Sequence, residues 1–220
     1  MTEEAELTAE RIRAEAAGTD GVVQVVRTGE REVEIVIWNT DGSNAEMSGN
    51  GTRIAGAWLM RRTGDAHARV VVGSRVVDVR EMGDELYESD MGEVEVGALE
   101  TVDGVQLTTV SVGNPHAVVI ADPGDVTRLG PLLETHPHFP NRTNVQVARV
   151  DSPGEVTARV WERGVGETTA SGSSAVAVAA ATHDQGEVLV HFPGGDLRVR
   201  LEDGRAWLIG PAEPLPVADA

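Results

Sequence analysis

The stretch NAEMSGNGTRIAGAWL, residues 44–59, places a serine and a Gly-Asn-Gly turn directly before a run of small and apolar residues. A second stretch of the same kind, ETTASGSSAVAVAAA, covers residues 167–181. Serine is a common N-cap residue, and glycine lets a ligand approach the open N–H groups at a helix start. Each stretch therefore predicts a helix that begins at a Ser-Gly pair and is suited to hold an anion.

The two stretches belong to an internal repeat with an offset of 123 residues. The segments related by this offset are Ser48 with Ser171, Trp38 with Trp161, and residues 22–33 with residues 145–156. Each copy contains a strand, a turn, a second strand that ends in Trp, a polar loop and the Ser-Gly helix start. A repeat of this size is typical of two lobes with the same arrangement of helices and strands.

The predicted fold class is α/β, with two pseudo-symmetric lobes that each wrap a curled, barrel-like mixed β-sheet around a central helix. The central helices, over residues 51–62 and 172–183, are rich in Ala and apolar almost all round, so we expect both to be largely buried. The segments that follow them alternate like strands and carry the matching turn signals Gly83-Asp84 and Asp203-Gly204.

The boundary between the lobes is expected near residues 93–105. The N-terminal lobe then spans residues 1–95 and is completed by residues 208–220, while the C-terminal lobe spans residues 96–207. In the second lobe, residues 110–121 read as a strand with a polar GNPH loop, followed by a helix over residues 123–136. The first lobe has a matching helix over residues 7–18, but the counterpart of Asn114 falls before Met1, so this lobe lacks its leading strand.

The composition narrows the classes of partner. A formal charge of −18 and a pI near 4.6 argue against nucleic acid and anionic membranes, which normally meet basic patches. The surface is expected to be acidic and well solvated, as in ordinary acidic proteins or in salt-adapted ones. The acidic N-terminus has no apolar signal region, and no window approaches the roughly 18 apolar residues of a membrane span. A cytoplasmic protein is the expectation.

The chain contains no Cys, and all 18 of its basic residues are Arg. Without Lys it has no Schiff-base residue, which excludes pyridoxal-phosphate chemistry and lysine-based aldol chemistry. Without Cys it has no disulfide and no thiolate, either as a nucleophile or as a metal ligand. The HPH sequence at residues 136–138 is interpreted as a loop rather than a metal site, so we expect neither a cofactor nor a metal.

Taken singly, Ser48 or Ser171 is explained as an N-cap. Their repetition favours a binding site instead, because two helix starts can present N–H groups and positive dipole ends to one carboxylate. Polar residues in loops of the same organisation support this interpretation. They are Asn39, Asn114, Asn144, Glu162 and Arg163.

Four motifs together resemble the diaminopimelate epimerase family. They are WNTDGSNAEMSGNGTR, SVGNPHAVVI, FPNRTNVQ and WERGVGETTASGSSA, and they follow one another over nearly the whole chain. The resemblance implies a two-lobed, cofactor-independent epimerase that interconverts LL- and meso-diaminopimelate for lysine and peptidoglycan precursor synthesis. It also implies a two-base mechanism, in which one Cys removes the α-proton and a second Cys returns a proton to the opposite face.

Carried over by motif, the resemblance assigns roles to particular residues. Gly49, Asn50, Gly172 and Ser173 would bind the α-carboxylate. Asn39, Asn114, Asn144, Glu162 and Arg163 would fix the rest of the substrate. His116 and Glu162 stand where the family places groups that tune the two thiols, although a structural role beside Pro115 is an equal alternative for His116.

The sequence departs from the family at the chemistry itself. Ser48 and Ser171 occupy both positions where the family has Cys, and an alcohol is a poorer base than a thiol, whose pKa lies near ~8.5. A serine acts when a neighbour takes its proton, and His116 and Glu162 are the available neighbours. The missing leading strand also removes an Asn that the family contributes to its site.

Three functions stay open at this stage. The first is an epimerase with Ser48 and Ser171 at the acid/base positions, acting on diaminopimelate or a similar amino acid. The second is another proton-shifting isomerase that uses a carboxylate such as Glu162 or Asp41. The third is a protein that binds an amino acid or other carboxylate with little or no turnover. Serine at both positions fits a natural change and also a deliberate substitution that traps a substrate complex. The open strand edge of the first lobe suggests a homodimer.

Overall fold

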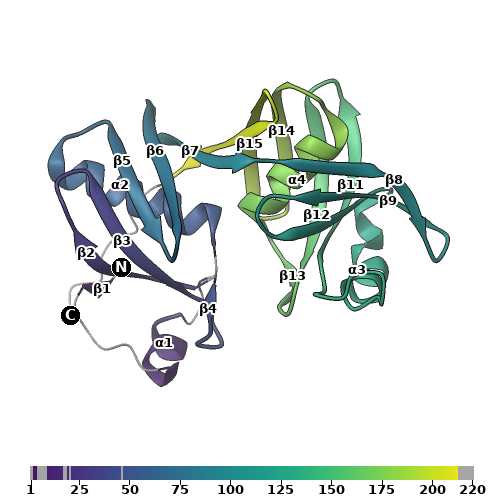
Figure 1. Ribbon diagram of the computed structural model, residues 1–220, viewed down its shortest axis with the longest axis horizontal. Coiled ribbons are helices and arrows are strands. Elements are labelled where there is room, and N and C mark those ends of the chain that lie inside the picture. The colour runs from purple at the N-terminus through teal and green to yellow at the C-terminus, as the bar shows by residue number, and fades with distance from the viewer. Residues whose placement is uncertain (1, 4–8, 17–18, 20, 46, 213–220) are drawn as a thin grey trace. The chain divides into compact units, whose positions relative to one another are not determined.

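The computed structural model describes residues 2–3, 9–16, 19, 21–45 and 47–212 (Figure 1). The chain divides into two compact units: unit 1 comprises Met1–Asp90 with Pro211–Ala220, and unit 2 comprises Met91–Gly210. The lobe bounds expected from the sequence, residues 1–95 and 96–207, stay a prediction. Of the segment 208–220 that was expected to complete the first lobe, residues 213–220 lie outside the described residues.

Unit 1 is a mixed sheet with two helices. Its sheet order is β1-β2-β3-β5-β6-β7, and β4 pairs with β3. The strands are β1 (Thr2–Glu3), β2 (Val22–Thr28), β3 (Glu32–Trp38), β4 (Asn44–Ala45), β5 (His67–Val72), β6 (Arg75–Gly83) and β7 (Leu86–Glu93). The helices are α1 (Ala9–Glu15) and α2 (Gly49–Thr63).

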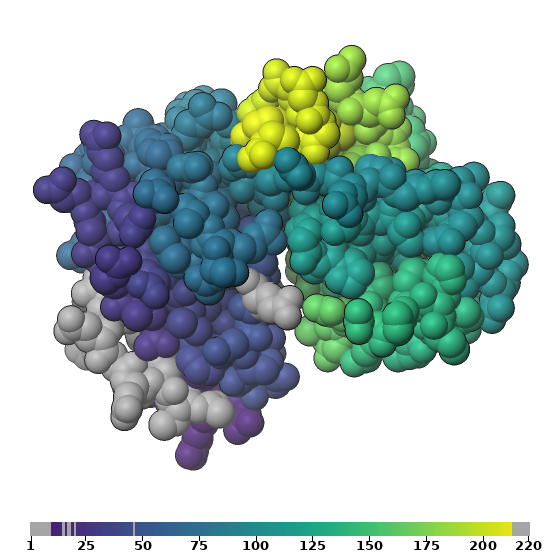
Figure 2. Space-filling model, in the orientation of Figure 1, coloured from purple at the N-terminus to yellow at the C-terminus, as the bar shows by residue number. Residues whose placement is uncertain are grey.

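Unit 2 repeats this arrangement and adds a hairpin at one edge. Its sheet order is β16-β15-β14-β12-β11-β10-β9-β8, and β13 pairs with β12. The strands are β8 (Glu95–Val102), β9 (Val105–Ser111), β10 (Pro115–Ile120), β11 (Asn144–Ser152), β12 (Glu155–Glu162), β13 (Gly166–Thr168), β14 (Gly186–Phe192), β15 (Gly195–Glu202) and β16 (Arg205–Pro211). The helices are the short 3-10 helix η1 (Pro123–Asp125), α3 (Val126–Glu134) and α4 (Gly172–Thr182). The β8–β9 hairpin forms part of the teal surface in Figure 2.

The repeat read from the sequence is present in the strand pairing. Val22 lies opposite Trp38 in the β2–β3 pair, and Val145 lies opposite Trp161 in the β11–β12 pair, with the same 123-residue offset in both strands. In each unit the next pairing is parallel, β3 with β5 and β12 with β14, because the central helix forms the crossover. The two-lobed α/β fold predicted from the sequence is confirmed.

Unit 1 has a short counterpart of the leading strand of unit 2. Glu3 of β1 pairs with Val25, and Ile120 of β10 pairs with Ala148, in parallel and at equivalent positions of the repeat. β1 therefore takes the place of the last two residues of β10.

The central helices are buried as their composition predicts. In α4 every residue from Ser174 to Ala179 is buried, and small side chains let the helix contact strands of its sheet closely. In α2 the buried side combines small residues such as Ala55, Gly56 and Ala57 with the larger Leu59 and Met60. Ile54 is exposed, and the last turn is polar. The β6–β7 turn lies one residue later than its Gly83-Asp84 signal predicts. Asp84 and Glu85 occupy the turn, with φ of 52° and 58°.

Replacement of Gly56 by Ala is expected to destabilise unit 1. A Cβ at this position of α2 would lie 2.7 Å from Cβ of Val79 and 2.8 and 2.9 Å from its two γ-carbons. Overpacking of this kind costs about 1–3 kcal/mol and exceeds the gain of about 1 kcal/mol in helix propensity. Thermal denaturation should show a lower Tm for Gly56→Ala and partial recovery in Gly56→Ala/Val79→Ala. A single variant as stable as the parent protein would contradict this packing.

Candidate active site

The two predicted helix starts have the same backbone geometry. Ser48 is the N-cap of α2 with φ −142° and ψ 119°, and Ser171 is the N-cap of α4 with φ −148° and ψ 128°. The first helical hydrogen bonds run from Thr52 N to Ser48 O and from Ala175 N to Ser171 O. The preceding N–H groups of Gly49 and Asn50, and those of Gly172 and Ser173, therefore lie outside the helical hydrogen-bond pattern and are available to an anion.

The two serine hydroxyl groups have different surroundings. The Oγ of Ser48 accepts a hydrogen bond of 3.1 Å from the N–H of Gly51, as an N-cap side chain does. The side chain of Ser171 makes no capping hydrogen bond and is largely buried. Ser171 thus holds the backbone geometry of an N-cap without using its hydroxyl for that purpose.

His116 is fully enclosed in a polar network of unit 2. Its Nε2 lies 3.0 Å from Oδ1 of Asn114, and its Nδ1 lies 3.0 Å from Nε2 of Gln146. Gln146 donates a second hydrogen bond to Oγ of Ser174 in the first turn of α4. An amide oxygen only accepts and an amide nitrogen only donates, so this network requires a neutral His116 with its proton on Nε2. The chain from Asn114 to Ser174 ties the GNPH loop to the start of α4.

Burial makes that neutral form strongly favoured. Loss of solvation lowers the pKa of His116 from 6.5 to about 3, and the nearby positive charge of Arg163 acts in the same direction. In this arrangement His116 is a positioning group whose two ring nitrogens are both engaged. The family resemblance predicts a catalytic role for His116, and this stays a prediction. Such a role would require that the hydrogen bond to Asn114 or to Gln146 be broken.

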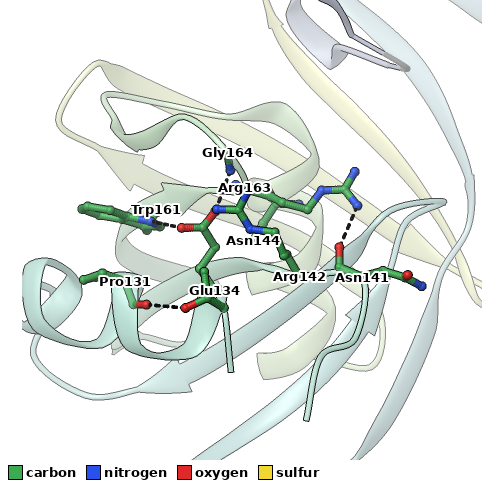
Figure 3. A network of polar contacts seen from close by, with 9 residues as sticks. Pro131, Glu134, Asn141, Arg142, Asn144, Trp161, Arg163 and Gly164 are labelled. Atoms are coloured by element: carbon green, nitrogen blue, oxygen red, sulfur yellow. Dashed lines mark hydrogen bonds and ion pairs between the residues drawn. The ribbon is translucent and has the colours of Figure 1, made fainter. Parts of the chain in front are cut away.

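Asn144 joins two loops beside this network. Its Nδ2 donates to the carbonyl of Pro115 over 2.9 Å, and its Oδ1 accepts from the backbone N–H of Arg163 over 2.9 Å. Arg163 also donates from Nη1 to the carbonyl of Asn141, as Figure 3 shows. Glu162 accepts a hydrogen bond of 2.7 Å from Oγ1 of Thr168 in β13. Unit 2 therefore brings Asn114, His116, Asn144, Glu162 and Arg163 into one connected region.

Glu134, at the end of α3, organises the other side of this region and was not predicted. Its buried carboxylate accepts hydrogen bonds from Nε1 of Trp161, the N–H of Gly164 and the guanidinium of Arg142 (Figure 3). Through these contacts it fixes the β12–β13 turn that carries Arg163. Its position two residues before the HPH loop gives no local signal, because all three partners come from later parts of the chain.

In unit 1 the predicted residues form two separate groups. Asn39 donates to Oγ of Ser43 over 2.9 Å, and Asp41 accepts from both the backbone and the hydroxyl of Ser43. These hydrogen bonds from Ser43 hold the pKa of Asp41 below its usual range, so the carboxylate is a weaker proton acceptor. At the start of α2, Oδ1 of Asn50 accepts from Nη2 of Arg53 over 3.0 Å. Among the described residues, no hydrogen bond joins the Asn39 loop to Ser48 or Asn50.

The HPH loop pairs with acidic side chains of the β8–β9 hairpin. His136 Nε2 lies 3.0 Å from Oδ2 of Asp103, and His138 Nε2 lies 3.2 Å from Oε1 of Glu100. The described part of the chain has no group of three or more His, Asp or Glu residues that could hold a metal ion. Over the same residues, no helix is long and apolar enough to cross a membrane.

The family model of diaminopimelate epimerase matches residues 3–97 and 108–213. The chain belongs to the diaminopimelate epimerase family. The diaminopimelate epimerase of Desulfitobacterium hafniense is 37% identical over 89% of this chain and 80% of its own length. That of Methanothermobacter thermautotrophicus is 34% identical over 87% of this chain and 78% of its own length.

Solved structures show the diaminopimelate epimerase fold over most of the chain. A predicted epimerase from Pseudomonas aeruginosa has a TM-score of 0.67 at 20% identity, covering 94% of this chain and 86% of its own. A hydroxyproline epimerase from Agrobacterium vitis has a TM-score of 0.63 at 14% identity, covering 88% and 73%. With the family match, these comparisons make the protein an isomerase of the epimerase type.

The buried, neutral His116 predicts a pH dependence of stability. The unfolded chain binds a proton at His116 near pH 6.5 and the folded chain only near pH 3, so its contribution to stability is complete above pH 6.5 and is lost as the pH falls towards 3. The slope from this group is at most about 1.4 kcal/mol per pH unit. Urea unfolding between pH 4 and 7 should show a smaller slope for His116→Gln than for the parent protein. Equal slopes in His116→Gln and the parent protein would contradict this protonation state.

Proposed function

We propose that this protein interconverts LL- and meso-diaminopimelate by proton transfer at the α-carbon, without a cofactor. The observation that carries the proposal is the pair of equivalent helix starts, in which Ser48 and Ser171 have nearly the same backbone dihedral angles. After each serine, the N–H groups of the first two helical residues lie outside the helical hydrogen-bond pattern. Such N–H groups stabilise a carboxylate, and they stabilise it more strongly as negative charge develops during removal of the α-proton. We take diaminopimelate as the substrate because the relatives are named diaminopimelate epimerases.

The proposed reaction needs one group that removes the α-proton and a second that returns a proton on the opposite face. We assign these two roles to Ser48 and Ser171. The backbone N–H groups of Gly49, Asn50, Gly172 and Ser173 hold the α-carboxylate, and Asn39, Asn114, Asn144 and Arg163 fix the remainder of the substrate. Glu162 takes or returns the hydroxyl proton of a serine, since an alcohol needs a base beside it. His116 supports the site through Asn114 and Gln146.

Exchange of the α-proton tests this assignment directly. When the protein is incubated with LL-diaminopimelate in deuterated water, proton NMR should show slow loss of the α-proton signal. Ser171→Ala should reduce the exchange rate by about 10²-fold or more, because acid–base groups contribute at least this much. Ser48→Cys/Ser171→Cys should exchange faster than the parent, since a thiol ionises more readily.

Ser152→Ala, at the end of β11, is the matched control and should exchange at the parent rate. Near-normal exchange in Ser171→Ala would refute a role of the serines in proton transfer. Saturable binding of diaminopimelate with no exchange at any enzyme concentration would instead support a binding protein, the third function considered from the sequence.

We also propose a homodimer that forms along β2 and a cytoplasmic location. Among the described residues, β2 pairs on its outer side with β1 at Gln24 and Val25, and Val26 beside them is 51% exposed. We therefore propose this strand as the edge that a second copy covers. Light scattering should give twice the chain mass of 23.3 kDa, and Val26→Lys should shift the protein to the single-chain mass. The mass of one chain at micromolar concentration would contradict the dimer. Cell fractionation tests the location.

A further inference from the structure

Arg53 is buried in the second turn of α2 without a negative partner. Its side chain donates from Nε to the carbonyl of Pro211 over 3.0 Å and from Nη2 to Oδ1 of Asn50 over 3.0 Å, while Nη1 is buried with no hydrogen-bond partner. Arg53 is only 5% exposed, and no carboxylate among the described residues forms an ion pair with it. Burial lowers its pKa to about 10.

This placement is unfavourable for folding alone. A cation near a helix N-terminus opposes the helix dipole, and a buried guanidinium loses its hydration without recovering it from an ion pair. An apolar side chain of similar length would fill the same space at lower cost. Stability of the fold therefore does not explain why Arg53 is buried here. Its hydrogen bond to Asn50 indicates a role at the start of α2.

The bond between Arg53 and Asn50 decides which end of the Asn50 amide faces outward. A guanidinium only donates, so it holds the amide oxygen, and the Nδ2 group is left as a donor at the start of α2. The reversed amide would place two donors against each other and would present its oxygen to an incoming carboxylate. Arg53 therefore gives the helix start a side-chain donor in addition to its backbone N–H groups.

We propose that Arg53 is a positioning residue, which locks Asn50 with its amide nitrogen towards the substrate carboxylate. This inference rests on the proposed function for the identity of the ligand, diaminopimelate. It does not require turnover, since it concerns the orientation of one amide and the affinity that follows. The contribution of such a hydrogen bond to a charged group corresponds to about a 10- to 100-fold change in affinity.

The test uses calorimetric titration with LL-diaminopimelate and a double-mutant cycle. Arg53→Met and Asn50→Ala should each raise the dissociation constant about 10-fold or more, and the double variant should bind no more weakly than Asn50→Ala alone, because Arg53 acts through Asn50. Arg53→Lys, which keeps one donor but loses the fork, should lie between the parent and Arg53→Met. Additive losses in the double variant, or unchanged affinity in Arg53→Met, would overturn the proposal.

Arg61→Met is the matched control. Arg61 lies two turns further along α2 and donates to the carbonyl of Ala212, so it also holds the segment after β16 but does not touch Asn50. It should bind diaminopimelate as the parent does. If it loses affinity as much as Arg53→Met, anchoring of residues 211–212 explains the effect and the positioning role is wrong.

A ligand-free measurement separates this inference from the proposed function. In nitrogen-15 NMR, the side-chain NH₂ signals of Asn50 should move in Arg53→Met and stay in place in Arg61→Met. If the parent protein binds no diaminopimelate, the proposed function fails while these signals still decide the role of Arg53. Unmoved Asn50 signals in Arg53→Met would overturn the positioning role even when the proposed function holds.

Discussion

The packing of a small-residue helix against the sheet of its own unit is the constraint on which the rest of the structure depends. In α4, Ala and Val at buried positions let the helix contact several strands, and in α2 Gly56 allows the same close approach to Val79. Because these helices are buried, their first turns are fixed with little freedom. The open N–H groups at Gly49 and Gly172 are therefore preorganised, which is the condition for strong electrostatic stabilisation.

The two helix starts share a backbone but are supported by different side chains. In unit 1, Arg53 reaches back to Asn50 within the same helix. In unit 2, Ser174 is held from outside the helix by Gln146 and His116. At the positions of the repeat that correspond to Gln146 and Ser174, unit 1 has Val23 and Gly51, so it cannot form the second network. The two copies of the repeat thus share the N-cap backbone geometry at Ser48 and Ser171, while the side chains that support the two helix starts differ.

Local patterns were sufficient to predict most of the fold. The 123-residue offset predicted matching strands, helices and N-caps, because a repeated pattern of apolar and turn residues folds into repeated structure. The burial of α4 follows from its Ala-rich composition, whereas α2 is buried on one side only, with Ile54 exposed. The β6–β7 turn lies one residue later than its Gly-Asp signal because the pairing of Gly83 with Leu86 places Asp84 and Glu85 in the turn. That pairing depends on the whole hairpin.

The site was less accessible to prediction where it depends on contacts between distant segments. Glu134, Gln146 and Arg53 were missed. Glu134 and Gln146 contact partners that only the fold brings near, and Arg53 is buried against the carbonyl of Pro211 in the same way. Two signals were nevertheless present. Arg53 is the single charged residue within the otherwise small and apolar residues 51–60, and Gln146 interrupts an apolar strand, and both patterns mark a buried polar group that needs a partner.

The chemistry of a serine at these helix starts depends more on its neighbours than on the helix. A helix N-terminus stabilises a negative group by about 0.3–2 kcal/mol, or roughly one pKa unit. An alcohol is less acidic than a thiol by far more than this, so neither helix start alone makes its serine a base. His116 cannot act as the base that removes the serine proton while both of its ring nitrogens are hydrogen-bonded to Asn114 and Gln146. The proposed carboxylate binding and the proposed proton transfer therefore depend on different features. The first depends on the backbone N–H groups at the starts of α2 and α4, and the second on a base such as Glu162 that takes the hydroxyl proton.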